Sequence, residues 1–94
     1  MIIIMVRENL KIILGEELRF LAIKTKERLS LTQREMGEKL QMSESSYSDI
    51  ETGKYKCGAL TAILLLGLQE DPERFLLTVN ENFDSWLEKE MLTV

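Results

Sequence analysis

One stretch, Leu31–Tyr55, constrains the fold of this chain more than any other part of the sequence: LTQREMGEKLQMSESSYSDIETGKY. Thr32, followed three residues later by Glu35, has the pattern of a capping box, which begins a helix. Ser43 is a good N-cap for a second helix, and Gly53 can adopt the left-handed conformation that ends it. The stretch therefore predicts two short helices, about 33–40 and 44–51, joined by a tight turn.

Apolar side chains at helical spacing give each of these helices an inward face. Tyr47 and Ile50 belong to the second helix, and Met36 to the first. Gly37 lies beside Met36, although glycine costs a helix roughly 1 kcal/mol relative to alanine. Gly37 has no side chain, which indicates that another helix approaches it closely. Ser46, a small residue of the second helix, is expected to contact Gly37.

Three further helices are predicted around this pair. The first, residues 13–28, has inward-facing leucines at positions 14, 18 and 21. Residues 60–69 are almost wholly apolar, so that helix must be buried on most sides, within this domain or against a second copy. Asp71 caps a last helix, with Pro72 in its first position, running to about residue 91. Its apolar stripe consists of Leu76, Val79, Phe83, Trp86 and Met91.

The N-terminal run MIIIMV favours a strand, because Ile and Val are β-branched. We expect a short strand or loose arm over residues 1–12, although the second aliphatic run, residues 10–14, is an alternative start for the first helix. The run either covers the core or forms a dimer contact through an exposed strand edge. Six apolar residues fall far short of the roughly 20 that span a membrane. Because signal-peptide features are also missing, we expect a cytoplasmic protein.

Composition excludes several classes of function. Ninety-four residues, 45% of them hydrophobic, make one domain with a single modest core. The lone Cys57 cannot form an intrachain disulfide. Because the sequence has no histidine, neither a zinc site nor a cysteine nucleophile with an obvious base is expected. We therefore expect no enzymatic activity, no metal and no cofactor, and no small-molecule effector is evident.

The net charge of −4 is unevenly distributed. Residues 13–57 hold eight basic and eight acidic side chains, whereas residues 58–94 hold two basic and seven acidic ones. An acidic chain disfavours nucleic-acid binding, but the local field at the binding face decides the matter. The two predicted short helices lie in the balanced part, so binding of nucleic acid there is compatible with the overall charge.

These residues resemble the Cro/phage-repressor type of helix-turn-helix protein, the Xre family, from Leu14 to about Leu68. The most specific matches are Thr32-Gln33, Gly37, Ser43, Ile50-Glu51 and Gly53-Lys54. The resemblance implies an all-α, five-helix bundle with a helix-turn-helix domain over residues 13–69. Residues 70–94 then form an amphipathic helix that packs on the domain or at a dimer interface. Most members of the family bind operator DNA as dimers and regulate transcription.

The resemblance also implies roles for individual residues. The positions expected to read base edges are Glu44, Ser45, Ser48 and Asp49. The positions expected to contact the DNA backbone are Gln33, Arg34, Ser43, Lys54, Tyr55 and Lys56. Gln33 would also brace the second helix of the motif. Tyr47 stands where the family has an aliphatic core residue, so its hydroxyl needs a partner. Glu51 is expected to be structural, paired with Arg19 or Lys26.

The acids at Glu44 and Asp49 leave two functions open. A carboxylate near phosphate opposes DNA binding, but in the major groove it can accept a hydrogen bond from the cytosine amino group. The leading hypothesis is a sequence-specific regulator of transcription that binds double-stranded DNA as a homodimer. The alternative is a protein-interaction module, such as an antitoxin-like or regulatory partner, with weak or no DNA binding; the acids would then lie on a solvated helix face.

Overall fold

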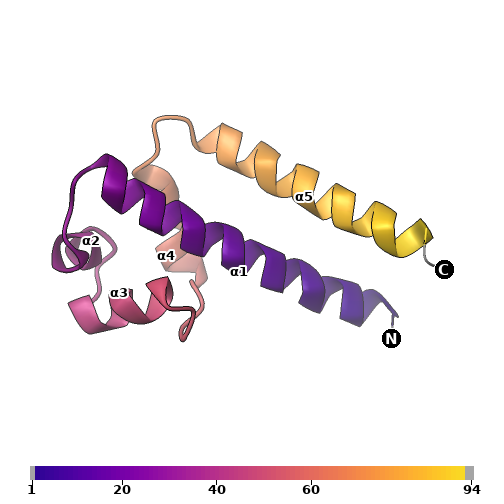
Figure 1. Ribbon diagram of the computed structural model, residues 1–94, viewed down its shortest axis with the longest axis horizontal. Coiled ribbons are helices and arrows are strands. Elements are labelled where there is room, and N and C mark those ends of the chain that lie inside the picture. Colours follow the sequence, from indigo (N-terminus) through magenta and orange to yellow (C-terminus); the bar gives the residue numbers. More distant parts are fainter. Residues whose placement is uncertain (1, 93–94) are drawn as a thin grey trace.

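The computed structural model describes the backbone of residues 2–92 and the side chains of residues 5–90, and the described part is entirely helical (Figure 1). Its helices are α1 (Ile2–Arg28), α2 (Gln33–Lys39), α3 (Glu44–Glu51), α4 (Ala59–Gly67) and α5 (Pro72–Leu92). The predicted all-α fold with five helices is therefore confirmed.

The strand or loose arm expected over residues 1–12 is wrong, because α1 runs without a break from Ile2. Met1 lies outside the described residues. Once the buried part of α1 is helical, each further residue adds one hydrogen bond, so the helix propagates through β-branched residues. A strand at this place would also need a partner strand, and residues 2–92 offer none. Locally, Lys11 pairs with Glu8 at 3.1 Å along the helix surface.

The core lies where α1 to α4 meet. Its buried cluster consists of Leu18, Ala22, Met36, Leu40, Tyr47 and Leu65. These residues confirm the inward faces predicted for α2 and α3. Leu14 was expected to be buried too, but it is 37% exposed because the core ends at Leu18 in the direction of the α1 N-terminus.

The apolar helix α4 is only partly covered within one chain. Leu65 is fully buried, whereas Leu60 and Ile63 are 68% and 67% exposed. One of the two environments expected for α4, burial on most sides within a single chain, is therefore wrong.

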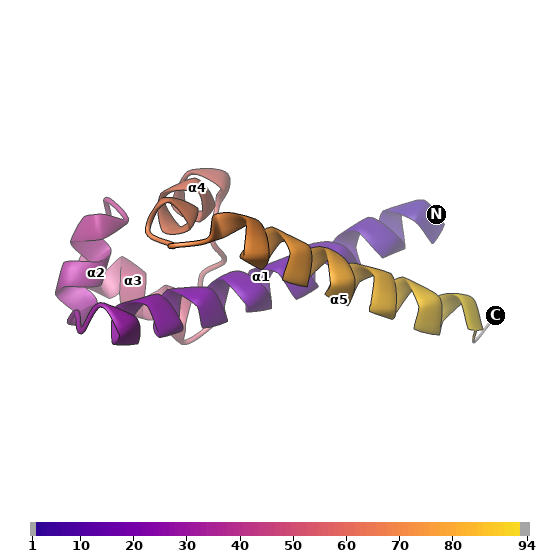
Figure 2. The same ribbon diagram turned by 90° about the horizontal axis from the view of Figure 1, so that it is seen from above.

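α5 runs back beside α1 in the opposite direction, and both helices extend past the core, so the start of α1 and the end of α5 lie at the same end of the molecule (Figures 1 and 2). Asn82 Nδ2 donates to Glu17 Oε1 at 2.7 Å between them. The radius of gyration is 14.6 Å, against about 12.4 Å for a compact domain of this length. The molecule is therefore a small globular end with a two-helix projection, which we call the hairpin (α1 residues 2–17 and α5 residues 79–92). None of the described helices is both long and apolar enough to cross a bilayer.

Candidate nucleic-acid interface

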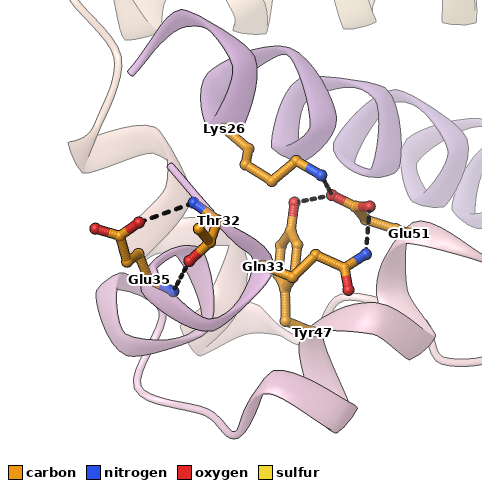
Figure 3. A network of polar contacts seen from close by, with 6 residues as sticks. All are labelled: Lys26, Thr32, Gln33, Glu35, Tyr47 and Glu51. Carbon is orange, nitrogen blue, oxygen red and sulfur yellow. Dashed lines mark hydrogen bonds and ion pairs between the residues drawn. The ribbon is translucent and has the colours of Figure 1, made fainter. Parts of the chain in front are cut away.

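Local hydrogen bonds set the beginnings of α2 and α3 as the sequence predicts. The Glu35 amide donates to Thr32 Oγ1 at 3.1 Å, and the Thr32 amide donates to Glu35 Oε1 at 3.0 Å, which completes the capping box (Figure 3). The backbone and side-chain hydrogen bonds with Thr32 lower the pKa of Glu35. The Ser46 amide donates to Ser43 Oγ at 3.1 Å, so Ser43 is confirmed as the N-cap of α3.

Gly37 is required by the turn between the two helices. A β-carbon at this position would lie 2.9 Å from the Met42 carbonyl oxygen and 3.1 Å from that of Ser43. The Met42 amide donates to the Gly37 carbonyl at 2.9 Å, which holds the turn against the helix. The close approach that glycine indicated is thus confirmed, but its partner is the turn backbone and not Ser46. The Ser46 hydroxyl instead accepts from Ser43 Oγ at 3.0 Å.

The carboxylate of Glu51 joins α1, α2 and α3 (Figure 3). Lys26 Nζ lies 2.8 Å from Oε2, and the Tyr47 hydroxyl donates to the same oxygen at 2.6 Å. Gln33 Nε2 donates to Oε1 at 3.0 Å. Lys26 is therefore the partner of Glu51, and Arg19 instead lies beside an acid on its own helix. The predicted brace from Gln33 to α3 and the partner that the Tyr47 hydroxyl needed are both confirmed.

The electrostatics of this network favour a charged Glu51. Burial by itself raises the pKa of Glu51, but hydrogen bonds from Lys26, Tyr47 and Gln33, together with the Lys26 charge, outweigh it and lower the pKa. Burial, followed by the hydrogen bond to Glu51 and its charge, raises the pKa of Tyr47. The network is thus an ionised carboxylate surrounded by three donors, and it fixes the orientation of α3 relative to α1 and α2.

The outward face of α3 is polar. Ser45 is exposed, and Ser48 and Asp49 are half-buried; all three lie on the side opposite the buried Tyr47 and Ile50. An α-helix with its side chains is about 10–12 Å in diameter, so a helix such as α3 fits the major groove of DNA, which is about 12 Å wide.

Glu44, in the first turn of α3, is exposed and lies closer to the Glu51 side of the helix. Among the described residues neither Glu44 nor Asp49 forms an ion pair. Both carboxylates therefore contribute uncompensated charge to the surface around α3.

Thr52 shares the outward face of α3, although it was not among the residues predicted to contact DNA. It follows Ser48 by four residues and Asp49 by three, and it is exposed as the C-cap of the helix. Its hydroxyl donates to the Asp49 carbonyl at 3.2 Å. The signal that could have identified this position is the helical spacing, because Thr52 follows Ser45 by seven residues, or about two turns.

The loop after α3 folds back against the helix. Gly53 has φ of 80°, as predicted for a helix-ending glycine. The Tyr55 amide then donates to the Asp49 carbonyl at 3.1 Å, which brings residues 54–56 beside the C-terminal half of α3. Lys54, Tyr55 and Lys56 are all exposed there. Two of the basic side chains expected near phosphate are therefore adjacent to the outward face of α3.

The remaining expected backbone contacts lie at the beginnings of α2 and α3. Arg34 is exposed and lies 3.6 Å from Glu38 on the same helix, and Ser43 is exposed at the N-cap of α3. Gln33 is half-buried, because one end of its amide is held by Glu51. The structure thus distributes the expected contact residues around α3 rather than at a single point.

Two features of residues 5–90 bear on thiol chemistry and metal binding. Cys57 is half-buried, and burial raises the pKa of its thiol, which disfavours the reactive thiolate. Within those residues, no group of three His, Cys, Asp or Glu side chains is placed to hold a metal ion.

A family model described as a helix-turn-helix domain matches residues 13–74, about two-thirds of the chain. The matched region contains all of α2, α3 and α4 and ends shortly after the start of α5. Neither the curated proteins nor the solved structures include a match to this chain.

Proposed function

We propose that this chain, which belongs to the helix-turn-helix domain family and is of the Cro/C1 (Xre-like) type, binds double-stranded DNA sequence-specifically and regulates transcription. The observation that carries the proposal is the Glu51 network. In this network one carboxylate holds α3 against α1 and α2. Tyr47 and Ile50 of this eight-residue helix are buried in the core, and its polar face stays outside the core. A helix held in this way is suited to lie in a major groove.

Base recognition in this proposal belongs to the outward face of α3. Ser45, Ser48 and Thr52 carry hydroxyls that both donate and accept, and so suit any base edge. Asp49, in the middle of the face, is an acceptor only and selects the cytosine amino group. Glu44 lies at the edge of the face, where it would accept from a flanking cytosine.

Phosphate contacts in this proposal surround that face. Lys54 and Lys56 supply charge beside the end of α3, and Arg34 supplies it at the beginning of α2. Gln33 keeps one amide hydrogen for phosphate after donating the other to Glu51. The remaining contacts are polar groups that position the helix and carry no sequence information, from Ser43 and Tyr55.

Few cations per chain imply weak binding by one copy, so the proposal includes a homodimer that reads two half-sites. The DNA-binding unit spans residues 13–69, and residues 70–94 lie outside the groove and contribute to assembly. A cytoplasmic location and the lack of an effector remain expectations from the sequence.

One observation supports a second function. The carboxylates of Glu44 and Asp49, which form no ion pair among the described residues, add negative charge to the α3 surface, and α5 carries two basic and five acidic side chains elsewhere on the molecule. A surface of this charge suits a protein partner with a basic patch. In that case the helix-turn-helix fold serves protein recognition, and duplex binding is weak or undetectable.

Selection from a random duplex library separates the two functions. The selection is performed at low salt and repeated at higher salt, because phosphate contacts weaken steeply with salt while base readout determines which sequences persist. Enrichment of a two-half-site sequence at both salt concentrations supports the regulator. Absence of any enriched sequence, with a stable protein complex recovered from lysate, supports the interaction module instead.

A further inference from the structure

A crevice lies where the hairpin joins the globular end, between α1, α5 and the turn that follows α4. Its volume is about 290 Å³, at the lower end of the range of about 300–1,000 Å³ that small-molecule sites have. The lining comes from residues 17–24 and from residues 69–78, which are distant in the sequence, so no local pattern marks it. A crevice of this size suits a ligand smaller than a typical drug molecule.

The antiparallel course of α1 and α5 gives the crevice two ends (Figure 1). Asn82 of α5 donates to Glu17 of α1 at 2.7 Å, so these two residues lie at the same level. Lys24 follows Glu17 by seven residues and Arg74 precedes Asn82 by eight, so both lie about 10–12 Å further toward the turn. The crevice therefore has two cations at the end beside the turn and the Glu17 carboxylate at the far end.

The two cations at the turn end have no partner within the described part of the chain. The side chains of Lys24 and Arg74 are exposed, and among the described residues neither forms an ion pair or a hydrogen bond. Asp71 lines the same end, but it accepts from the backbone amide of Arg74, at 3.2 Å. Two cations on neighbouring helices thus present donors for a carboxylate.

The turn end also carries acceptors. The Gln69 amide donates to Thr25 Oγ1 at 2.8 Å and to the Leu65 carbonyl at 2.9 Å, which uses both of its hydrogens. The Thr25 hydroxyl gives its own hydrogen to the Leu21 carbonyl at 2.6 Å, so it must accept from Gln69, and this fixes the orientation of the amide. No described residue donates to the Gln69 oxygen or to the second oxygen of Asp71. These two acceptors suit an ammonium group.

The part of the crevice between its two ends is apolar. Phe20 and Leu21 line it from α1, and Phe75 lines it from α5. Phe20 is 49% exposed, so much of its surface is open to a ligand. The Thr78 hydroxyl donates within its own helix at 2.9 Å and so adds no donor to the crevice. These walls suit an aromatic ring, and the Glu17 charge disfavours a second carboxylate at the far end.

We propose that this crevice binds a free α-amino acid with an aromatic side chain. Its carboxylate lies between Lys24 and Arg74, its ammonium group donates to Gln69 and Asp71, and its ring lies in the apolar part. A simple anion such as phosphate suits the site less well, because the Asp71 carboxylate lies at the same end as the cations. The amino acid would be an effector, in contrast to the expectation from the sequence that there is none. The inference goes beyond the proposed function and does not rest on DNA binding.

L-Phenylalanine and two of its analogues test the chemistry of the site. 3-Phenylpropionate lacks the ammonium group, and phenethylamine lacks the carboxylate. Because solvent screens the exposed Lys24 and Arg74, we expect a Kd on the order of 1 mM for L-phenylalanine. NMR titration of the wild type should show saturable shifts at the residues that line the crevice. Each analogue should bind about tenfold more weakly, because it leaves charged groups of the site without a partner.

Arg74→Gln and Arg7→Gln form a matched pair of variants. Arg7 is also exposed, but it precedes Glu17 by ten residues, or about 15 Å along α1, and does not line the crevice. Arg74→Gln should weaken binding of L-phenylalanine about tenfold, and Arg7→Gln should leave it unchanged. Lys24→Gln is a second variant with the same expected loss. All three positions are exposed, and circular dichroism checks that the variants remain helical.

Three results would overturn the inference. They are the absence of saturable shifts around the crevice at several times the expected Kd, equal affinity for L-phenylalanine and its analogues, and equal affinity of Arg74→Gln and Arg7→Gln. The comparison of analogues uses the wild type alone, so it decides the matter even where a variant does not fold. All of these measurements are made without DNA, so their failure and the failure of duplex selection are independent outcomes.

Discussion

Replacing Glu51 by Gln should destabilise this protein more than any other single loss of charge that the structure describes. The change keeps the volume of the side chain but removes the charge opposite Lys26, whose side chain is 19% exposed. Gln also has one acceptor oxygen in place of two. Its NH₂ group must therefore face a donor, either Gln33 on one side or Lys26 and Tyr47 on the other.

The magnitude follows from burial. The Glu51 side chain is 13% exposed, so solvent screens the pair with Lys26 only in part. Hydrogen bonds to charged groups contribute about 1.5–3 kcal/mol each, and breaking a fully buried ion pair costs about 3–5 kcal/mol. For this partly buried site we expect a loss of about 2–4 kcal/mol from the free energy of unfolding. For a domain of this size that lowers Tm by on the order of 10 °C.

Urea denaturation followed by circular dichroism measures this loss, and Glu38→Gln is the matched control. Glu38 lies 3.6 Å from Arg34 but is 67% exposed, so the same chemical change there should cost less than about 1 kcal/mol. Equal loss of stability in the two variants would refute the reasoning, because it would mean that the Glu51 network contributes no more than a surface ion pair.

The pH dependence provides an independent check on the same residue. The pKa of Glu51 is lowered in the folded state, so Glu51 contributes stability that is present above the unfolded carboxyl pKa of about 4.3. That contribution is lost as pH falls through the folded pKa. The difference in unfolding free energy between wild type and Glu51→Gln should therefore be largest near neutral pH and shrink under acid conditions. A difference that stays constant across this range would contradict an ionised Glu51.

Three further substitutions follow from the helix-turn-helix geometry. Gly37→Ala should lower stability by about 1–3 kcal/mol, because the new β-carbon meets the Met42 carbonyl oxygen at 2.9 Å; a stabilised variant in thermal unfolding would contradict the close approach. Ser43→Ala should cost about 1 kcal/mol through loss of the hydrogen bond from the Ser46 amide, and unchanged urea unfolding would show that this cap contributes nothing. Lys54→Ala should weaken binding to every duplex and reduce the slope of log affinity against log salt by about 0.9; an unchanged slope would remove Lys54 from the phosphate contacts.

Local signals in the sequence were sufficient to predict the helix-turn-helix segment. Thr32, Ser43 and Gly53 act through hydrogen bonds or backbone angles within a few residues, so their effects depend little on the rest of the fold. The network around Glu51 was predicted only in outline. The bracing by Gln33 follows from the family resemblance, but the choice of Lys26 over Arg19 depends on how α1 is rotated against α3, which no local pattern specifies.

The errors arose where tertiary context decides. β-Branched residues favour a strand at the N-terminus only if a partner strand exists, and here the packed part of α1 extends the helix instead. Leu14 matches the inward spacing of Leu18, but helical periodicity does not show where along the helix the core ends. The partner of Gly37 was missed for a similar reason, since a contact with turn backbone leaves no side-chain pattern.

The most direct test of the proposed DNA recognition is duplex selection with Asp49→Asn beside the wild type. Asp49 lies in the middle of the outward face of α3, and a carboxylate there accepts from the cytosine amino group, whereas an amide pairs best with adenine. We predict that the enriched sequence changes at one position in each half-site, from cytosine to another base, and stays the same elsewhere. An enriched sequence that is identical for the two proteins would contradict the placement of α3 in the major groove.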